Sequence, residues 1–301
     1  MIKKTSNIYN RAFNKVLRGR ASVADTPDLV EGYVDRVGSY YLPTGFDGSF
    51  EDQITEANPF RKYGTVVKTF SSDSTIKAID PKVYAEFLPD GKNIPWSDDV
   101  SRDMYVYSYR IASAMKMSSE IAKDLKFDID KYLYREWAGA FASAEENMFI
   151  NGSGKSEPMG ILTSSETGVT AETLTYDDVV GLFFSLKPQY RKRAVWIMND
   201  KTAHVLRKIK DSNGNYLWNH SDNTILGRPV EYSEFMPDAE SGNKPIAFGD
   251  LSYYWVLERQ PAMVKVLSEM FIHEGNLGYI INERVDGKLI RPEAVKTLEI
   301  K

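Results

Sequence analysis

The chain has 301 residues, of which 42% are hydrophobic and 27% are charged, with a formal net charge of −4. These values are typical of soluble globular proteins and exclude a collagen-like or wholly disordered chain, while the length allows one large or two intermediate folded units. No cysteine is present, which excludes disulfide scaffolds, thiolate metal sites and cysteine nucleophiles.

The first twenty residues form a basic segment without any acidic residue. Only residues 12–18 have the spacing of a short amphipathic helix, and the glycine-rich remainder of the first 50 residues is predicted to be extended. We expect an N-terminal arm that contacts nucleic acid or an acidic surface of a neighbouring copy, with a solvated tail as the alternative. The cations of this arm are Lys3, Lys4, Arg11, Lys15, Arg18 and Arg20.

Two β-rich segments, residues 65–70 and 104–111, are separated by mostly polar residues. The intervening stretch contains the turn signal Leu88–Lys92. A polar stretch of this length inside a compact domain usually indicates a functional protrusion. We therefore predict a long two-stranded β-excursion with its tip at Pro89, Asp90, Gly91 and Lys92.

The strongest helix signal covers about residues 128–150, with Asp128 as N-cap. Apolar residues recur at three- and four-residue steps, which stacks them on one face. Glu145 and Glu146 are expected on a solvated face, and Asn151-Gly152 is expected to end the helix through a left-handed cap. The apolar stripe consists of Ile129, Leu133, Trp137, Ala140, Phe141, Ala144 and Met148.

The second half of the chain alternates helices with strands, which predicts a mixed α+β unit. A helix capped by Thr175 or Asp177 runs through Leu186, and another begins at Asp200 and runs to about Lys210. A buried strand is predicted over residues 193–198. Further strands are predicted at 246–248, 253–257, 263–267 and 279–282, with a hairpin turn at Asp286-Gly287.

Candidate catalytic and ligand motifs fail on spacing. Gly152–Ser156 resembles the end of a phosphate-binding loop but lacks its first glycine, and the Asp211–Asn215 turn lacks the glutamate that closes a calcium loop. The three histidines, His204, His220 and His273, are too far apart in sequence to form a local metal motif. We expect no catalytic, cofactor or metal site. The 12% aromatic content, with 18 tyrosines, favours a protein that contacts other proteins.

An ordered series of short motifs covers nearly the whole chain. Together they resemble the major capsid protein family of tailed phages, whose Hong-Kong-97-type fold is shared with encapsulin shells. The motifs begin at residues 12–18 and continue with Gly38–Pro43, Asn58–Arg61, Lys116–Glu120, Ile150–Gly154, Trp196–Asn199, Leu226–Val230, Phe248–Asp250 and Pro292–Ala294.

The resemblance implies an α+β fold with an N-terminal arm, a long β-hairpin extended loop, a peripheral domain with a spine helix, and an axial domain. On this sequence the arm would be residues 1–31 and the extended loop 64–112. The peripheral domain would comprise 32–63, 113–165 and 259–291, with the spine helix at about 128–150. The axial domain would comprise 166–258 and 292–301.

The function implied by the resemblance is self-assembly into hexamers and pentamers of an icosahedral shell around double-stranded phage DNA. The expected partners are copies of the chain itself, portal, scaffolding or protease proteins, a possible decoration protein, and packaged DNA in nonspecific contact. DNA or a neighbouring subunit would meet the arm cations and Phe13. The expected location is the virion, after assembly in the host bacterial cytoplasm, with no membrane contact.

Three alternatives stay open at this point. An encapsulin-type nanocompartment shares the fold, an α+β enzyme would need a convergent titratable cluster, and a small-molecule binding module has no specific motif behind it.

Two departures from the family pattern matter. Many relatives carry an N-terminal scaffolding segment that a protease removes, whereas here Met1 directly precedes the arm, so scaffolding is expected to be a separate protein or to lie outside this sequence. Some relatives also cross-link a loop lysine to an asparagine with the help of a glutamate. Lysines such as Lys77, Lys82 and Lys92 are present, but the glutamate and asparagine positions fall at Asn282 and near Gly275, so we predict no covalent cross-linking.

Overall fold

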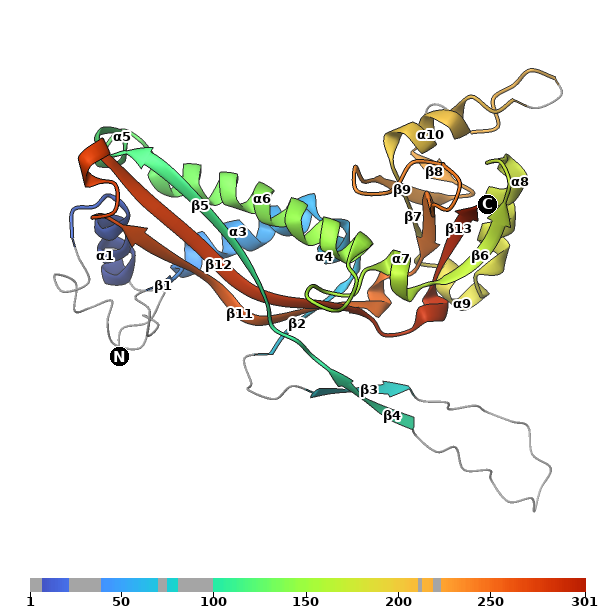
Figure 1. Ribbon diagram of the computed structural model, residues 1–301, viewed down its shortest axis with the longest axis horizontal. Coiled ribbons are helices and arrows are strands. Elements are labelled where there is room, and N and C mark those ends of the chain that lie inside the picture. The colour runs from blue at the N-terminus through green and yellow to red at the C-terminus, as the bar shows by residue number, and fades with distance from the viewer. Residues whose placement is uncertain (1–6, 22–38, 70–74, 81–99, 211–212, 219–222) are drawn as a thin grey trace, which may run out of the picture.

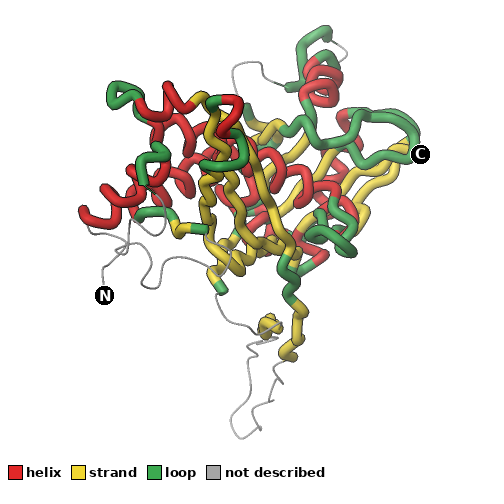
Figure 2. Tube along the Cα trace, turned by 60° about the vertical axis from the view of Figure 1, so that its left-hand side comes forward, coloured by secondary structure: helices red, strands yellow, loops and turns green. Residues whose placement is uncertain are grey.

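A computed structural model describes residues 7–21, 39–69, 75–80, 100–210, 213–218 and 223–301. Over this part of the chain the molecule has two sheet-and-helix units side by side, and a two-stranded hairpin that leaves the body between them (Figure 1). The tube view in Figure 2 shows the same hairpin standing clear of both units.

The first sheet has the strand order β1-β11-β12-β5, and β2 also pairs with β11, along a different part of that strand from β1. All its neighbours pair antiparallel except β2, which runs parallel to β11. The strands are β1 (Tyr40–Tyr41), β2 (Thr65–Lys68), β5 (Tyr109–Ser118), β11 (Tyr254–Leu267) and β12 (Asn276–Leu289).

Strand β11 merges two segments that we predicted as separate strands, 253–257 and 263–267. The pairing with β12 shifts register between Glu258 and Gln260 and again between Gln260 and Met263. Such irregularities let a strand pass a proline, here Pro261, without ending. The segment between the two predicted strands is therefore a pair of irregularities within one long strand and not a loop.

The predicted hairpin turn at Asp286-Gly287 is wrong, because both residues lie inside β12, opposite Leu257 and Val256. The chain turns instead between Leu267 and Asn276, where Gly275 has φ 69°. At position 287 glycine meets a packing demand: a Cβ there would lie 2.4 Å from the Tyr254 hydroxyl oxygen. An Asp-Gly pair is thus compatible with a strand where the glycine allows close approach.

Helices α3 (Thr44–Ala57), α4 (Pro59–Tyr63) and α6 (Ile129–Asn151) pack on this sheet, and α1 (Asn7–Leu17) lies at its end (Figure 1). The short α5 (Ser119–Lys123) follows β5. The predicted spine helix is confirmed as α6, with Asp128 accepting a hydrogen bond from the Lys131 amide.

Two local predictions in this unit are wrong. Gly152 caps α6 with φ −56° instead of a left-handed angle, and glycine is needed there because a Cβ would lie 2.0 Å from the Pro158 carbonyl oxygen. Helix α3 lies in a region predicted to be extended. Its buried residues Phe46, Phe50 and Ile54 recur every four positions, which is the helical signal that the nearby glycines obscured.

The second sheet has the strand order β6-β13-β10-β7-β9-β8. The strands are β6 (Glu166–Ala171), β7 (Val195–Met198), β8 (Thr224–Ile225), β9 (Arg228–Tyr232), β10 (Ile246–Gly249) and β13 (Val295–Ile300). Its helices are α8 (Tyr176–Ser185), α9 (Pro188–Arg191) and α10 (Asp200–Arg207), and α7 (Ile161–Ser164) follows α6.

The α+β prediction for the second half is confirmed. Thr175 caps α8 in a capping box with Asp178, and α10 begins at Asp200 as expected. The central strands β7 and β10 are buried on both faces, and the Trp196 and Phe248 rings stack with centroids 4.0 Å apart. Short 3₁₀ turns cover Leu251–Tyr253, Ile272–Glu274 and Pro292–Ala294.

The predicted β-excursion is confirmed at its base, where β3 (Thr75–Asp80) pairs antiparallel with β4 (Val100–Tyr105). Two details differ. The strand at 65–68 belongs to the first sheet instead of the hairpin, and the segment 104–111 is divided between β4 and β5 by residues 106–108. The expected tip, Pro89, Asp90, Gly91 and Lys92, lies outside the described residues.

Candidate assembly surfaces

Helix α1 is docked on the body of its own subunit. Tyr9, Phe13 and Leu17 are buried on one side of the helix. The Tyr279 hydroxyl donates to the Leu17 carbonyl oxygen at 2.6 Å, and the Tyr9 hydroxyl donates to the Tyr41 carbonyl oxygen at 2.6 Å. This part of the predicted arm is therefore a helix fixed by apolar burial.

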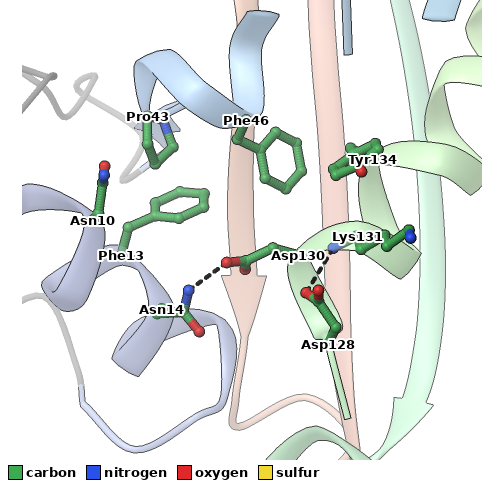
Figure 3. A pocket seen from close by; sticks show the side chains of 9 residues that line it. All are labelled: Asn10, Phe13, Asn14, Pro43, Phe46, Asp128, Asp130, Lys131 and Tyr134. Carbon is green, nitrogen blue, oxygen red and sulfur yellow. Dashed lines mark hydrogen bonds between the residues drawn. The ribbon is translucent and has the colours of Figure 1, made fainter. Parts of the chain in front are cut away.

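Phe13 was expected to face a neighbouring subunit or DNA, but its ring packs against Phe46 of its own chain, with centroids 6.0 Å apart. Figure 3 shows both rings beside a cavity of about 380 Å³ between α1, α3 and α6. Asp130 accepts a hydrogen bond from the Asn14 side chain there, and burial raises the pKa of its carboxyl group. The residues that line this cavity include no serine, threonine or histidine. The phenol of Tyr134 is the single hydroxyl group among them.

The arm cations divide into two groups. Arg18 holds the loop after α5, donating to the carbonyl oxygens of Asp124 at 2.5 Å and Phe127 at 2.9 Å. Arg11, Lys15 and Arg20 are exposed, although Arg20 also donates to a backbone carbonyl oxygen. Lys3 and Lys4 lie outside the described residues.

A groove of about 380 Å³ lies between α1 with the residues that follow it and Leu125 in the loop after α5. Four of its seven lining residues are basic, and none is acidic: Asn10, Arg11, Asn14, Lys15, Arg18, Arg20 and Leu125. The groove therefore has the charge that attracts an anionic partner.

The hairpin is fastened to the first sheet by three charged residues of β12. Arg284 donates to the Ser108 carbonyl oxygen at 3.0 Å, and Asp286 accepts from the Tyr107 amide at 2.8 Å. Lys288 donates to the Tyr105 carbonyl oxygen, and its ammonium lies 4.9 Å from the centre of the Tyr107 ring. The base of the projection is thus held to the body, while Tyr105 and Tyr107 are exposed.

A buried ionic cluster joins α4, α6 and the sheet. Arg61 binds Glu145 through two hydrogen bonds of 2.6 Å and binds Glu258 at 2.5 Å. A carboxylate oxygen of Glu283 lies 3.6 Å from the same guanidinium. Three carboxyl groups therefore share one buried arginine, although Lys68 also lies 3.6 Å from Glu258 at the edge of the cluster.

Burial raises the pKa of Glu283 well above its ordinary value, and the neighbouring Glu145 charge raises it further, while Arg61 acts in the opposite direction. This excess of acid favours a neutral Glu283. A cluster that already balances its charge in this way stabilises the packing of two helices on two strands.

The expectation that Glu145 is solvated is wrong, since its side chain has no exposed surface. The signal was available in the sequence. Glu145 follows Trp137 and Phe141 at steps of four residues, so it lies on the apolar stripe of α6 and not beside it.

The next residues along α4 and α6 face the second unit. Lys62 binds Glu231 at 2.8 Å, and the Tyr63 hydroxyl donates to the same carboxylate at 2.5 Å. The Asn151 side chain donates to the Phe235 carbonyl oxygen at 2.9 Å. The pair of helices that carries the ionic cluster therefore also contacts the second unit.

No cluster of three or more potential metal-binding acids or histidines exists among the residues that the structure describes. His204 lies in α10 and His273 in the turn between β11 and β12, so the two belong to different units, while His220 lies outside the described ranges. Within the same ranges, every helix is too short or too polar to cross a membrane.

Comparison with known proteins decides the family, because the model of the phage capsid family matches residues 38–300. The chain belongs to the phage capsid family. No curated protein matches it.

Solved capsid structures share the fold. The capsid of an empty GTA particle is 26% identical, with a TM-score of 0.64 over 81% of this chain and 90% of that one. The capsid of a native GTA particle is 24% identical, with a TM-score of 0.66 over 93% and 98% of the two chains. A chain of Gordonia phage Cozz is 12% identical, with a TM-score of 0.57 over 80% and 86%. The Hong-Kong-97-type fold is therefore confirmed, whereas the exact domain boundaries stay predictions.

Proposed function

We propose that this protein is a major capsid protein whose copies form the hexamers and pentamers of an icosahedral shell around double-stranded phage DNA. The observation that carries the proposal is the family match over residues 38–300. The GTA capsid that shares 90% of its length with this chain supports it further. The projecting hairpin also fits, because it offers backbone and side chains beyond the body of its own subunit.

An encapsulin compartment is the alternative within the same fold, and the similar structures favour the phage-type shell, since they are capsids of GTA particles and chains of phages. A structural role also fits better than catalysis. The cluster of charged side chains around Arg61 is buried, and the side chains of Arg61 and its three glutamate partners are no more than 9% exposed.

The groove beside α1 is the proposed contact for DNA inside the shell. Four cations without a lining acid suit phosphate groups, and such contacts would be independent of sequence. Replacing Arg11 and Lys15 by glutamine should lower the retention of DNA in particles and weaken its dependence on salt. The same retention with both residues replaced would contradict this contact.

The remaining partners follow from the shell function. Portal and scaffolding or protease proteins would act during assembly in the host bacterial cytoplasm, and a decoration protein would bind the finished virion. These partners stay proposals that co-purification with assembling particles can test.

Negative-stain electron microscopy of the purified full-length chain tests the proposed function directly. Uniform hollow shells are the expected result. A chain that stays monomeric at high concentration, with and without the other phage proteins, would contradict it. Shells that carry a cargo enzyme and no DNA when recovered from their native host would favour the encapsulin alternative.

A further inference from the structure

The turn between β8 and β9 holds a leucine in a backbone conformation that this residue disfavours. Leu226 has φ 50° and Gly227 has φ 72°, so both central residues of the two-residue hairpin are left-handed. Asn-Gly is the usual pair in such a turn, because a bulky side chain at positive φ crowds its own backbone. Among the described residues, Leu226 is the only one other than glycine with a positive φ.

Surrounding contacts prevent the turn from relaxing. The Trp196 indole donates to the Ile225 carbonyl oxygen at 3.0 Å on one side of the turn. On the other side, Arg228 donates to the Lys192 carbonyl oxygen at 2.8 Å. Because both flanks are fixed, the leucine is held at its positive φ by the rest of the unit.

The Leu226 side chain is only partly covered by its own subunit. It is 39% exposed, whereas the neighbouring Ile225 is 3% exposed and belongs to the apolar core of the second sheet. Folding of the subunit therefore leaves part of a strained apolar side chain open to solvent. Strained residues are typical of functional positions.

The position of the turn in the sheet indicates what kind of partner Leu226 would contact. Within the part of the chain that the structure describes, β8 is the last strand of its sheet, so the turn lies at the edge of that sheet. An exposed leucine needs an apolar surface, while phosphate groups of DNA would select a cation or a hydrogen-bond donor. In a closed shell of identical chains, a patch on one subunit meets a different patch of the neighbouring copy. The next copy of the chain can therefore supply the apolar surface.

We propose that Leu226 is a contact residue between copies of this chain, presented by the β8–β9 turn to an apolar surface of the next subunit. This proposal rests on the proposed shell function. It assigns the strained turn a specific task in assembly, in which a less stable subunit conformation is retained for the sake of the contact.

Two substitutions at this position test the proposal. Leu226→Asn removes the apolar side chain and suits the positive φ, so the unassembled full-length chain should melt about 1–3 °C higher while the yield of shells falls several-fold. Leu226→Met keeps an apolar side chain of similar volume and should assemble like the unchanged protein. Thermal unfolding below the assembly concentration and particle counts by microscopy provide the two readouts.

Three results would overturn the proposal. Assembly of Leu226→Asn at the yield of the unchanged chain would show that the leucine has no role in contacts. A lower melting temperature for Leu226→Asn would show that the side chain packs within its own subunit. Equal loss of shells with Leu226→Met would point to the turn backbone instead. If the unchanged chain forms no shells, the proposed function fails, and this outcome is distinct from all three.

Discussion

At the scale of single residues, the decisive feature is the enclosure of Arg61 by three glutamates. A guanidinium that is only 3% exposed depends on its carboxylate partners, and each partner depends on it. Removing one side of a buried ion pair leaves a charge without compensation, whereas an exposed pair contributes little. Removing one member of the cluster should therefore cost more stability than removing one member of an exposed ion pair.

Arg61→Met should reduce the free energy of unfolding by about 3–5 kcal/mol, because three buried carboxyl groups lose their shared cation. Arg135→Met on α6 is the matched control, since Arg135 is 64% exposed and forms an exposed ion pair with Glu136. The control should change stability by less than about 0.5 kcal/mol. Chemical denaturation of both variants measures the difference, and similar losses would contradict a special role for Arg61.

The pH dependence of Glu283 gives a second test with a defined sign. Its raised pKa means that the folded chain holds a proton which the unfolded chain releases, so the stabilisation is complete below the ordinary glutamate pKa and is lost as pH rises through the raised value. Glu283→Gln mimics the neutral form. The difference in melting temperature between this variant and the unchanged protein should therefore shift in favour of the variant as pH increases.

Glu274→Gln is the control with the opposite sign. A hydrogen bond from Lys116 lowers the pKa of Glu274, so the contribution of this exposed carboxylate is present above the ordinary pKa and is lost as pH falls. Melting curves of the three proteins at several pH values separate the two effects. A Glu283→Gln variant that tracks the unchanged chain at every pH would show that Glu283 is not held neutral.

At the scale of elements, close approach determines where glycine is required. Strand β12 passes under α6 at Gly287, where an added Cβ would lie 2.7 Å from the Phe149 ring. Gly139 in α6 has no atom within 4 Å of an added Cβ. Close packing thus requires glycine at position 287, whereas no contact requires it at position 139.

Gly287→Ala should lower the free energy of unfolding by about 1–3 kcal/mol through overpacking, whereas Gly139→Ala should raise it by about 0.5–1 kcal/mol through helix propensity. Denaturant titrations of the two alanine variants provide the comparison. Stabilisation by both substitutions would show that β12 and α6 can move apart without loss.

At the scale of the whole molecule, α4 and α6 contact both units of the body. The hairpin projects from this body, and α1 presents exposed cations on its surface. In the proposed shell, strength then comes from many contacts between subunits acting together. We predict that assembled shells boiled in detergent migrate as single chains on a gel. Ladders of linked subunits would contradict the absence of covalent cross-linking.

Much of the local structure could be predicted from the sequence alone. Helix α6, the capping of α8 by Thr175, the buried strand β7 and the two-stranded base of the hairpin follow from periodicity, capping residues and β-propensity, which act over a few neighbouring positions. The ordered motifs also indicated the capsid family, which the match over residues 38–300 then showed.

Only the tertiary structure decided the roles that depend on distant segments. It placed Phe13 in the core of its own subunit, supplied Arg61 as the partner of the buried Glu145, and kept Asp286-Gly287 within a strand. In each case the local signal fits more than one environment. The choice between them is made by residues far along the chain, whose packing and charge become neighbours only after folding.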